Sequence, residues 1–350
     1  VEANVYSQGP HWLASIQSED ISGTVEFEEA QDEAPLSLTM KLQRLHIPDT
    51  AAEDLDGLIR PQHVDRRRKL PNLSLRIDDL KIGTRRIGKV DLMAGYKFPK
   101  TSIGPWEIQR LSVFNVGGSL HGTGRWLPDD LGGKTTIHLR GEVEDAGRTL
   151  QSLDIREVVR RAPGSFTAEL SWKGPITEFN TETLCGNIRL DAQRGSLLQV
   201  EPGAGRILSL LSMQHLLRRL QLDFRDVVSR GFDFDAIHSS GTLTDGIFHT
   251  EKTTVVGSSA AIVIGGNIDF VRDTLDLKAL VLPSINAEGA SLALAIANPA
   301  IGISTLIAQW MLKDQISELF STEYVVSGTF AEPTLEKVDL HHDAKTAPKN

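Results

Sequence analysis

Two aspartates are the nearest that this sequence comes to a catalytic or metal-binding pair. Asp233 and Asp235 flank Phe234, so both carboxylates would lie on one face of a β-strand. Carboxylates paired in this way bind calcium or act as general acid and base. The segment from Phe232 to Asp235 also has the alternation of a half-buried strand, with both phenylalanines facing a core. We favour this second interpretation, because it accounts for all four residues.

Other reactive residue types lack the neighbours that their chemistry needs. The stretch 117–124 is rich in glycine but has neither the lysine nor the strand-to-helix context of a phosphate-binding loop, so strand glycines explain it better. Cys185 is the single cysteine, which excludes an internal disulfide and a cysteine-based zinc site, and a packing role is expected. His341 and His342 lie in a polar tail that we expect to be solvated, with a metal site as the alternative.

The motifs of the common enzyme classes are missing. The sequence has no P-loop, no His-Glu-x-x-His, no Gly-x-Ser-x-Gly and no dinucleotide-binding fingerprint. We therefore predict that the protein is not an enzyme and has no catalytic residue, metal or cofactor. Of its 350 residues, 40% are hydrophobic and 24% are charged, which suits a folded chain. The net charge of -9 argues against nucleic acid as a partner, because phosphate binding needs a clustered basic face.

Alternation of apolar and polar residues runs through most of the chain and predicts half-buried strands. Glycine-containing breaks separate many of these runs, and most have no helix between them, which favours antiparallel meanders. The predicted fold class is mainly β, an antiparallel sheet with a few amphipathic helices. The clearest alternating runs are residues 36–42, 73–77, 166–172, 188–192 and 275–281.

Four stretches have helical spacing. Pro163 would end the second of them, and Pro299 would occupy the first turn of the fourth, where proline is favoured. The third carries two arginines near its C-terminal end, where cations are favoured. The four predicted helices are residues 50–59, 149–161, 205–220 and 299–320.

The chain is predicted to contain three β-rich segments and a tail, with no flexible linker between the segments. The basic run 63–69 is interpreted as a solvated loop, with contact to anionic lipid headgroups as the alternative. The chain begins without a basic and apolar leader, so we expect its targeting segment upstream. The segments are residues 1–65, which would continue an upstream sheet; 66–165, with a short helix; 166–338, with the helices near 205–220 and 299–320; and 339–350, a disordered tail.

Residues 289–312 contain no charge over the length that a bilayer crossing needs. Asn298 and Pro299 interrupt this run, and its first half alternates apolar with small residues in the manner of a strand. We therefore expect no membrane span here.

A long ordered string of residues resembles the YhdP family, a group of AsmA-like proteins. One departure is Gly257-Ser258, where the family tends to have Gly-Pro, and we interpret it as a turn variant. The similarity covers nearly the whole chain and is firmest over residues 165–338, as expected of the C-terminal region of such a protein. The string comprises Val200–Arg206, Leu208–Ser212, Leu217–Leu220, Leu222–Asp226, Gly231–Phe232 and Phe234–Asp235, with flanking matches at Leu70–Leu73, Ile87–Val90, Gly124–Trp126, Leu170–Trp172, Val281–Pro283 and Tyr324–Phe330.

The resemblance implies a periplasmic protein that an upstream helix anchors to the inner membrane. Members of this family form a long, curved, open β-sheet, an elongated groove with an apolar trough. They are implicated in phospholipid transport between the inner and outer membranes and in outer-membrane lipid homeostasis. The expected partners are therefore phospholipid acyl chains and both membranes, and a protein partner in the outer membrane or periplasm stays open.

Apolar strand residues are the candidates for the trough, with a packed core as the alternative for each. The helix 299–320 is expected to pack as a lid over the sheet end or to contact a membrane or partner. Two other functions stay open: an envelope assembly scaffold that binds proteins by strand addition, and an enzyme acting on an envelope polymer. The predicted lipid-binding residues are Ile188, Leu190, Ile262, Ile264, Leu275 and Leu277, and the predicted membrane or partner contacts are Leu306, Trp310 and Met311.

Overall fold

The fold is mainly β, as predicted. The computed structural model describes residues 2–31, 34–48, 70–98, 104–130, 132–155, 158–198, 232–258, 260–283 and 322–338. Their eighteen strands belong to one sheet. The chain divides into two compact units, Val1–Leu190 with Thr242–Gly246, and Asp191–Gly241 with Ile247–Asn350.

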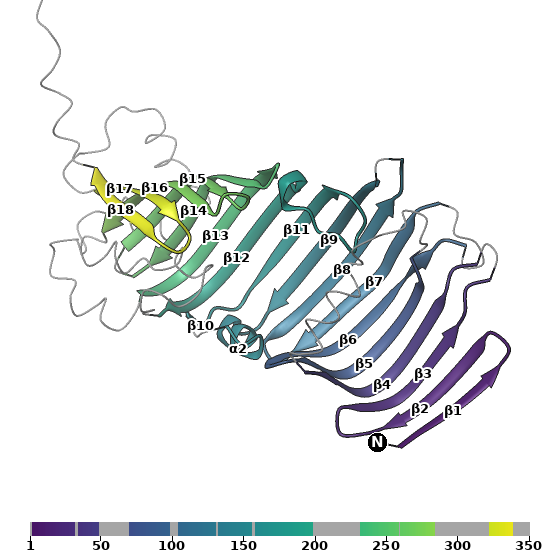
Figure 1. Cartoon of the computed structure of the whole chain (residues 1–350). Coiled ribbons are helices and arrows are strands. Elements are labelled where there is room, and N and C mark those ends of the chain that lie inside the picture. The colour runs from purple at the N-terminus through teal and green to yellow at the C-terminus, as the bar shows by residue number, and fades with distance from the viewer. Residues whose placement is uncertain are drawn as a thin grey trace, which may run out of the picture. The chain divides into compact units, whose positions relative to one another are not determined.

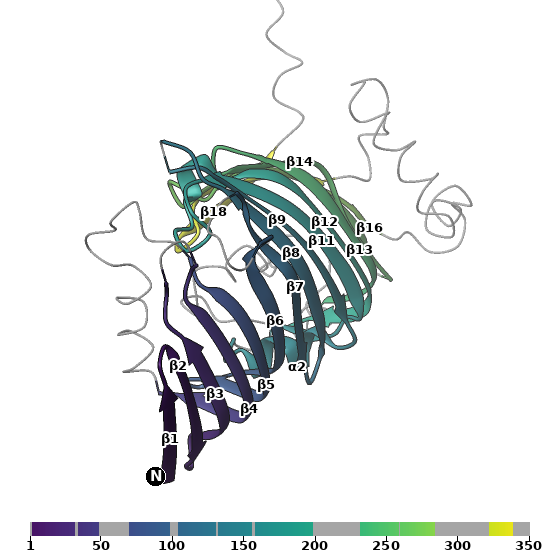
Figure 2. The ribbon, with the colours of Figure 1, turned by 90° about the vertical axis from the view of Figure 1, so that its right-hand side faces the viewer.

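The first unit is a run of long strands that follow one another in the sheet (Figure 1). Figure 2 shows that the strands of this unit bend along their length, so its sheet is curved. The elements are β1 (Glu2–Gln8), β2 (His11–Gln17), β3 (Ile21–Glu28), β4 (Ser37–Ile47), β5 (Asn72–Ile82), β6 (Arg85–Tyr96), β7 (Trp106–Asn115), β8 (Gly118–Leu127), β9 (Lys134–Val143), α2 (Ala146–Ser152), β10 (Val159–Arg161), β11 (Gly164–Lys173), η1 (Thr181–Thr183) and the start of β12 (Cys185–Leu197).

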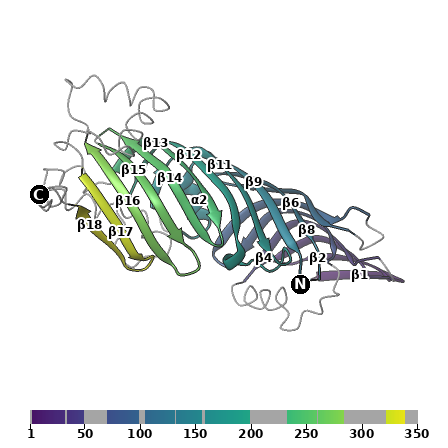
Figure 3. The same cartoon turned by 90° about the horizontal axis from the view of Figure 1, so that it is seen from above.

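The second unit contains a five-stranded antiparallel meander, in which β14 to β18 pair in chain order. Figure 3 shows these strands side by side. Tight turns join several of them, with Asp273 at positive φ in the turn before β16. The elements are β13 (Phe232–Thr244), β14 (Ile247–Gly257), β15 (Ala260–Asp269), β16 (Thr274–Pro283), β17 (Thr322–Thr329) and β18 (Pro333–Val338).

One strand pair departs from the predicted antiparallel pattern. β4 and β5 are parallel, with Leu38 opposite Leu73 and Leu42 opposite Ile77. Parallel neighbours need a crossover of a dozen or more residues, and residues 48–71 are long enough to supply it. The prediction of an all-antiparallel sheet was wrong at this pair, because alternation within a strand carries no information about the direction of its neighbour.

Irregular register accompanies the bend of the first unit. One extra residue is inserted in β4 at Gln43, in β5 at Asp78–Asp79, in β6 at Ile87 and in β7 near Gln109. Such bulges bend a strand and increase its local twist. These bulges lie on the neighbouring strands β4 to β7, so we infer that they contribute to the same bend.

The helix predicted over residues 149–161 is shorter and begins earlier. α2 starts after Asp145, whose side chain accepts a hydrogen bond of 3.0 Å from the Arg148 amide. It ends at Ser152, and Asp154 has a φ of 58° that no helix accommodates. Val159 then opens β10, because β-branched residues suit a strand better than a helix.

Several predictions fall outside the described residues. These are the helices at 50–59, 205–220 and 299–320, the basic run 63–69, the uncharged stretch 289–312 and the tail 339–350. In the part of the chain that the structure describes, no helix has the length and apolarity to cross a membrane. The glycine-rich stretch 117–124 does lie at the turn before β8 and within that strand, as predicted.

Gly141 tests how tightly the apolar face of the first unit is packed. A Cβ at Gly141 would lie 2.0 Å from the ring of Phe166, its cross-strand partner on β11. Gly141→Ala should therefore lower the free energy of unfolding by about 1–3 kcal/mol, as overpacking does. Urea unfolding measures this loss, which should shrink in a Phe166→Leu background. An equal loss in both backgrounds would contradict the contact.

Candidate functional site

The candidate site is one face of the first unit, which we call the first apolar face. The strand registers place three consecutive rows of residues across β2 to β9 and β11, and every position is apolar or glycine. The rows are Trp12, Phe27, Leu38, Leu73, Ala94, Ile108, Gly124, Ile137 and Leu170; then Ala14, Val25, Met40, Leu75, Leu92, Leu111, Gly122, Leu139 and Ala168; then Ile16, Gly23, Leu42, Ile77, Val90, Val113, Leu120, Gly141 and Phe166.

This face is only partly protected from water. Leu42, Ile77 and Val90 are buried, but Leu92 and Leu111 are half-buried. Among the described residues, α2 and η1 are the only helical elements, and both are short. An apolar sheet face is normally covered by a second layer of structure. The described part of the chain supplies no such layer of helices.

A row of large side chains borders the first apolar face at one end of the strands. Tyr96, Trp106, Trp126, Thr135 and Trp172 are successive cross-strand partners over β6, β7, β8, β9 and β11. Tyr96 and Trp106 are buried with Ala94 in a cluster that also contacts Trp126. We call this row the aromatic border.

The aromatic border is fixed to the loops beside it by hydrogen bonds. The indole N–H of Trp106 donates to the carbonyl of Pro71 over 2.8 Å, and that of Trp126 donates to Gly132 over 3.0 Å. Trp172 donates to Pro175 over 3.3 Å. Buried indole groups need such partners. The border therefore closes this end of the apolar face without leaving the polar atoms of its indoles unsatisfied.

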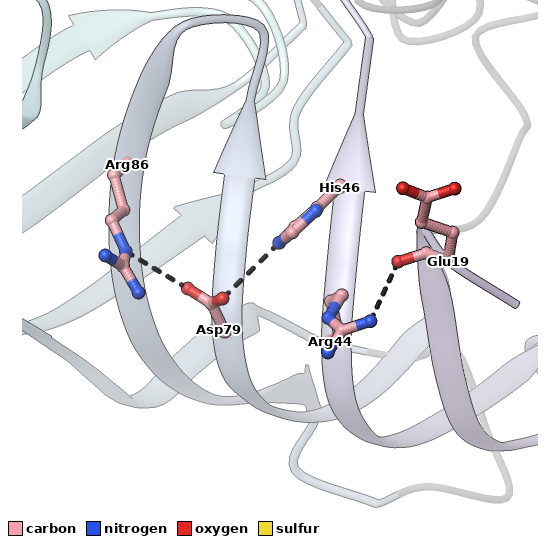
Figure 4. Close-up of polar contacts among 5 residues, drawn as sticks. All are labelled: Glu19, Arg44, His46, Asp79 and Arg86. Atoms are coloured by element: carbon pink, nitrogen blue, oxygen red, sulfur yellow. Dashed lines mark hydrogen bonds and ion pairs between the residues drawn. The ribbon is translucent and has the colours of Figure 1, made fainter.

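The opposite face of the same strands is polar and carries cross-strand ion pairs. Asp91 lies between Arg76 and Arg110, at 3.5 and 2.9 Å. Figure 4 shows a second group, in which Asp79 lies between His46 and Arg86, at 3.4 Å from each, while Arg44 donates to the carbonyl of Glu19. Opposite charges on neighbouring strands stabilise their pairing. Such pairs also keep this face hydrated.

His46 and Arg86 stabilise the ionised form of the Asp79 carboxyl. Partial burial raises the pKa of the Asp79 carboxyl, but the hydrogen bond with His46 and the charge and hydrogen bond of Arg86 outweigh this effect. The pKa of Asp79 therefore lies below its ordinary value.

The second unit has an apolar face of its own, and it includes four of the predicted lipid-binding residues. Ile262 and Ile264 on β15 share this face with Leu275 and Leu277 on β16. Ile262, Leu275 and Leu277 are buried, and Ile264 is half-buried. Leu275 and Leu277 pack with Phe330. We call this surface of β15 to β18 the second apolar face.

The other five predicted contact residues lie on β12 or outside the described residues. Ile188 and Leu190 alternate on β12, where Ile188 is half-buried and Leu190 is 41% exposed. Leu306, Trp310 and Met311 lie outside the described residues. The lipid contacts of all nine residues therefore stay predictions.

The aspartates that could have formed a catalytic pair face solvent. Phe232 and Phe234 are buried, whereas Asp233 and Asp235 are exposed, which confirms the predicted alternation. Asp233 is hydrogen-bonded to Ser196. Cys185 is half-buried, and its thiol lies 3.9 Å from Asp245. No group of three or more metal-ligating side chains occurs among the described residues.

Comparison with known proteins decides the family. The model of the YhdP protein family matches residues 1–335. The chain belongs to the YhdP family. A curated relative, the intermembrane phospholipid transporter YhdP of Escherichia coli K12, is 31% identical over 219 residues, which is 61% of this chain. The chain spans only 17% of that relative's length. No solved structure matches the chain.

Sequence reasoning did not identify the first apolar face of this YhdP family member. The longest uninterrupted apolar surface among the described strands lies over β2 to β9 and β11, before the residues that were predicted to bind lipid. The alternation at 36–42 and 73–77 indicated apolar faces, but their common side depends on strand register.

The Asp79 cluster predicts an acid dependence of stability. The pKa of Asp79 is lower in the folded state than in the unfolded state. The Asp79 carboxylate therefore adds to the free energy of unfolding above the unfolded-state pKa of about 3.9, and this contribution is lost as the pH falls through the folded-state pKa. Asp79→Asn should thus be less stable than the wild type at pH 7, and the difference should shrink below about pH 4. Urea unfolding from pH 7 to pH 3 measures it. A difference that is constant over this range would contradict the assignment.

Proposed function

We propose that the chain binds phospholipid through its apolar sheet faces and is part of a phospholipid transporter. The supporting observation is the first apolar face, where three rows over nine strands contain no polar side chain. The relative named as an intermembrane phospholipid transporter supports the choice of ligand. Acyl chains would lie on the apolar side, while the headgroup stays in water.

The dimensions of the first apolar face suit acyl chains. Nine strands spaced by about 4.8 Å extend over roughly 38 Å, and three rows extend over about 13 Å along the strands. An acyl chain in one leaflet of a bilayer extends about 15 Å, half of the hydrocarbon thickness. Acyl chains can therefore lie along this face across the strands, and more than one lipid can be accommodated.

The energetics favour a shielding role and need no catalysis. Each CH₂ group removed from water contributes about 0.8 kcal/mol. Transfer along a continuous apolar face avoids this cost at every step, since one row of residues replaces the next. No bond is made or broken, so the proposal includes no catalytic residue, metal or cofactor.

For the whole protein we propose transport between the inner and outer membranes, with the chain in the periplasm and its anchor to the inner membrane upstream. The chain matches only a small part of the curated relative, so most of that relative lies outside the matched part.

Binding of a protein by strand addition is the alternative function that one observation favours. All residues of β1 are exposed, and they include Val5 and Tyr6, which is 69% exposed. Large apolar side chains on an exposed strand suit pairing with another strand. This role can coexist with lipid binding.

Leu92 and Met93 form a matched pair for testing lipid binding. They are neighbours on β6, but Leu92 lies on the first apolar face, whereas Met93 is 45% exposed on the polar face. Leu92→Glu should lower the copurified phospholipid at least about tenfold, because a charge in an apolar environment costs more than 1.4 kcal/mol. Met93→Glu should retain the lipid. Lipid extraction and native mass spectrometry measure both, and circular dichroism checks the fold.

The outcomes separate the two candidate functions. If Leu92→Glu and Met93→Glu retain equal amounts of lipid, the first apolar face is not the surface that binds phospholipid. A wild-type chain that neither copurifies with phospholipid nor binds it from micelles would favour the strand-addition alternative.

A further inference from the structure

The polar face of β4 to β7 carries more cations than anions. Its strand positions hold seven lysines and arginines against four carboxylates, so three positive charges are in excess. The chain as a whole has a net charge of -9, so this surface differs in sign from the rest of the protein. We call it the basic face; its cations are Lys41, Arg44, Arg76, Lys81, Arg86, Lys89 and Arg110, and its carboxylates are Asp78, Asp79, Asp91 and Glu107.

Two cross-strand pairs of the basic face bring like charges together. Lys41 on β4 lies directly opposite Arg76 on β5. Lys81 on β5 lies directly opposite Arg86 on β6. Like charges in these positions destabilise the pairing of strands. The stability of the sheet therefore does not account for the two lysines.

Three cations of the basic face have no carboxylate partner among the described residues. Lys41 and Lys81 are exposed and make no ion pair in this part of the chain. The guanidinium of Arg44 donates over 2.9 Å to the backbone carbonyl of Glu19, as Figure 4 shows. An anionic partner can therefore pair with these three side chains without breaking an existing ion pair.

The carboxylates that are paired lie deeper than their arginines. The side chain of Asp91 is 22% exposed, whereas those of Arg76 and Arg110, at 3.5 and 2.9 Å from it, are 63% and 56% exposed. Asp79 is 32% exposed and its partner Arg86 is 70% exposed. A molecule that approaches this face meets guanidinium groups first, and these suit carboxylates because they can donate two parallel hydrogen bonds.

Two large apolar side chains lie among the cations. Met93 on β6 is directly opposite Arg110, and Phe114 on β7 is directly opposite Lys89. Both apolar side chains are exposed. Arginine, methionine and aromatic residues are enriched where proteins bind one another. The strands of this unit also bend along their length (Figure 2), so a planar bilayer would contact only part of the face. These features favour a protein over a membrane surface.

We propose that the basic face binds an acidic protein segment. Carboxylates of the partner pair with Lys41, Arg44 and Lys81, and its apolar side chains contact Met93 and Phe114. The inference goes beyond the proposed function and does not depend on it, because this surface is on the opposite side of the sheet from the first apolar face. Lipid and protein partner can therefore be bound together. The surface also differs from β1, where a partner would add a strand.

The test uses the full 350-residue chain and a defined acidic peptide. The probe is a fluorescently labelled peptide of alternating Glu and Ser, and its control has Gln in place of every Glu. Fluorescence anisotropy at low ionic strength measures binding, because salt screens surface charges. The wild type should bind the Glu peptide and not the Gln peptide. Lys41→Gln/Lys81→Gln should weaken binding about two- to fivefold for each charge removed, as expected for surface ion pairs.

A matched control and a chemical crosslink locate the contact. Lys134→Gln/Lys173→Gln removes two exposed lysines that are also directly opposite each other in the first unit, and it should bind the Glu peptide as the wild type does. A carbodiimide joins peptide carboxylates to lysines in contact with them, and mass spectrometry should find the new amide bonds at Lys41 and Lys81. Amide bonds at Lys134 and Lys173 instead would overturn the site.

The remaining outcomes are also decisive. Without peptide, Lys81→Gln should have the same or a higher midpoint of thermal unfolding, because it relieves a like-charge pair. A lower midpoint would assign Lys81 to the stability of the sheet and would overturn the proposal. So would equal binding of the Glu peptide by the wild type and the Lys41→Gln/Lys81→Gln variant. If the wild type binds phosphatidylglycerol vesicles but not the Glu peptide, the face contacts a membrane and the protein partner is refuted. None of these results alters the copurification of lipid, which tests the proposed function separately.

Discussion

The structure of the first unit depends on one constraint, namely that a sheet with a wholly apolar face must keep that face from water. Burial of apolar area is the main favourable term in folding, and it is non-directional. Here the alternation of nine strands concentrates the apolar side chains on one side. The described residues place no layer of helices over them. In the proposed function, a lipid acyl chain covers this face in the same way as a second layer of protein would.

Other features of this unit maintain that separation of faces. The aromatic border closes one end of the strands, and its indoles are satisfied by loop carbonyls such as that of Pro71. Glycines at positions such as 122, 124 and 141 leave room for the larger side chains of neighbouring strands, and bulges allow the strands to bend. The ion pairs around Asp79 and Asp91 keep the other face polar.

The sequence predicted the strands and the outward or inward direction of residues such as Phe234 and Asp235 correctly, because alternation is a local property. It could not predict that β4 and β5 are parallel, since the direction of pairing depends on the path of the connection. It also missed the shared face of the first unit, because that face depends on register between strands. The helix predicted over residues 149–161 had the wrong bounds. The N-cap Asp145 and the positive φ of Asp154 determine where α2 begins and ends, and they outweigh the apolar spacing.

Photocrosslinking from adjacent residues tests the central claim most directly. A photoreactive amino acid placed at Leu75, Leu111 or Leu139 reports on the first apolar face, and the same probe at Arg76, Ser112 or Arg140 reports on the polar face one residue away. With phospholipid bound, we predict lipid adducts from the three leucine positions and none from the other three. Equal adduct yields on both faces, or adducts from the polar face alone, would contradict the assignment of the apolar face as the lipid-binding surface.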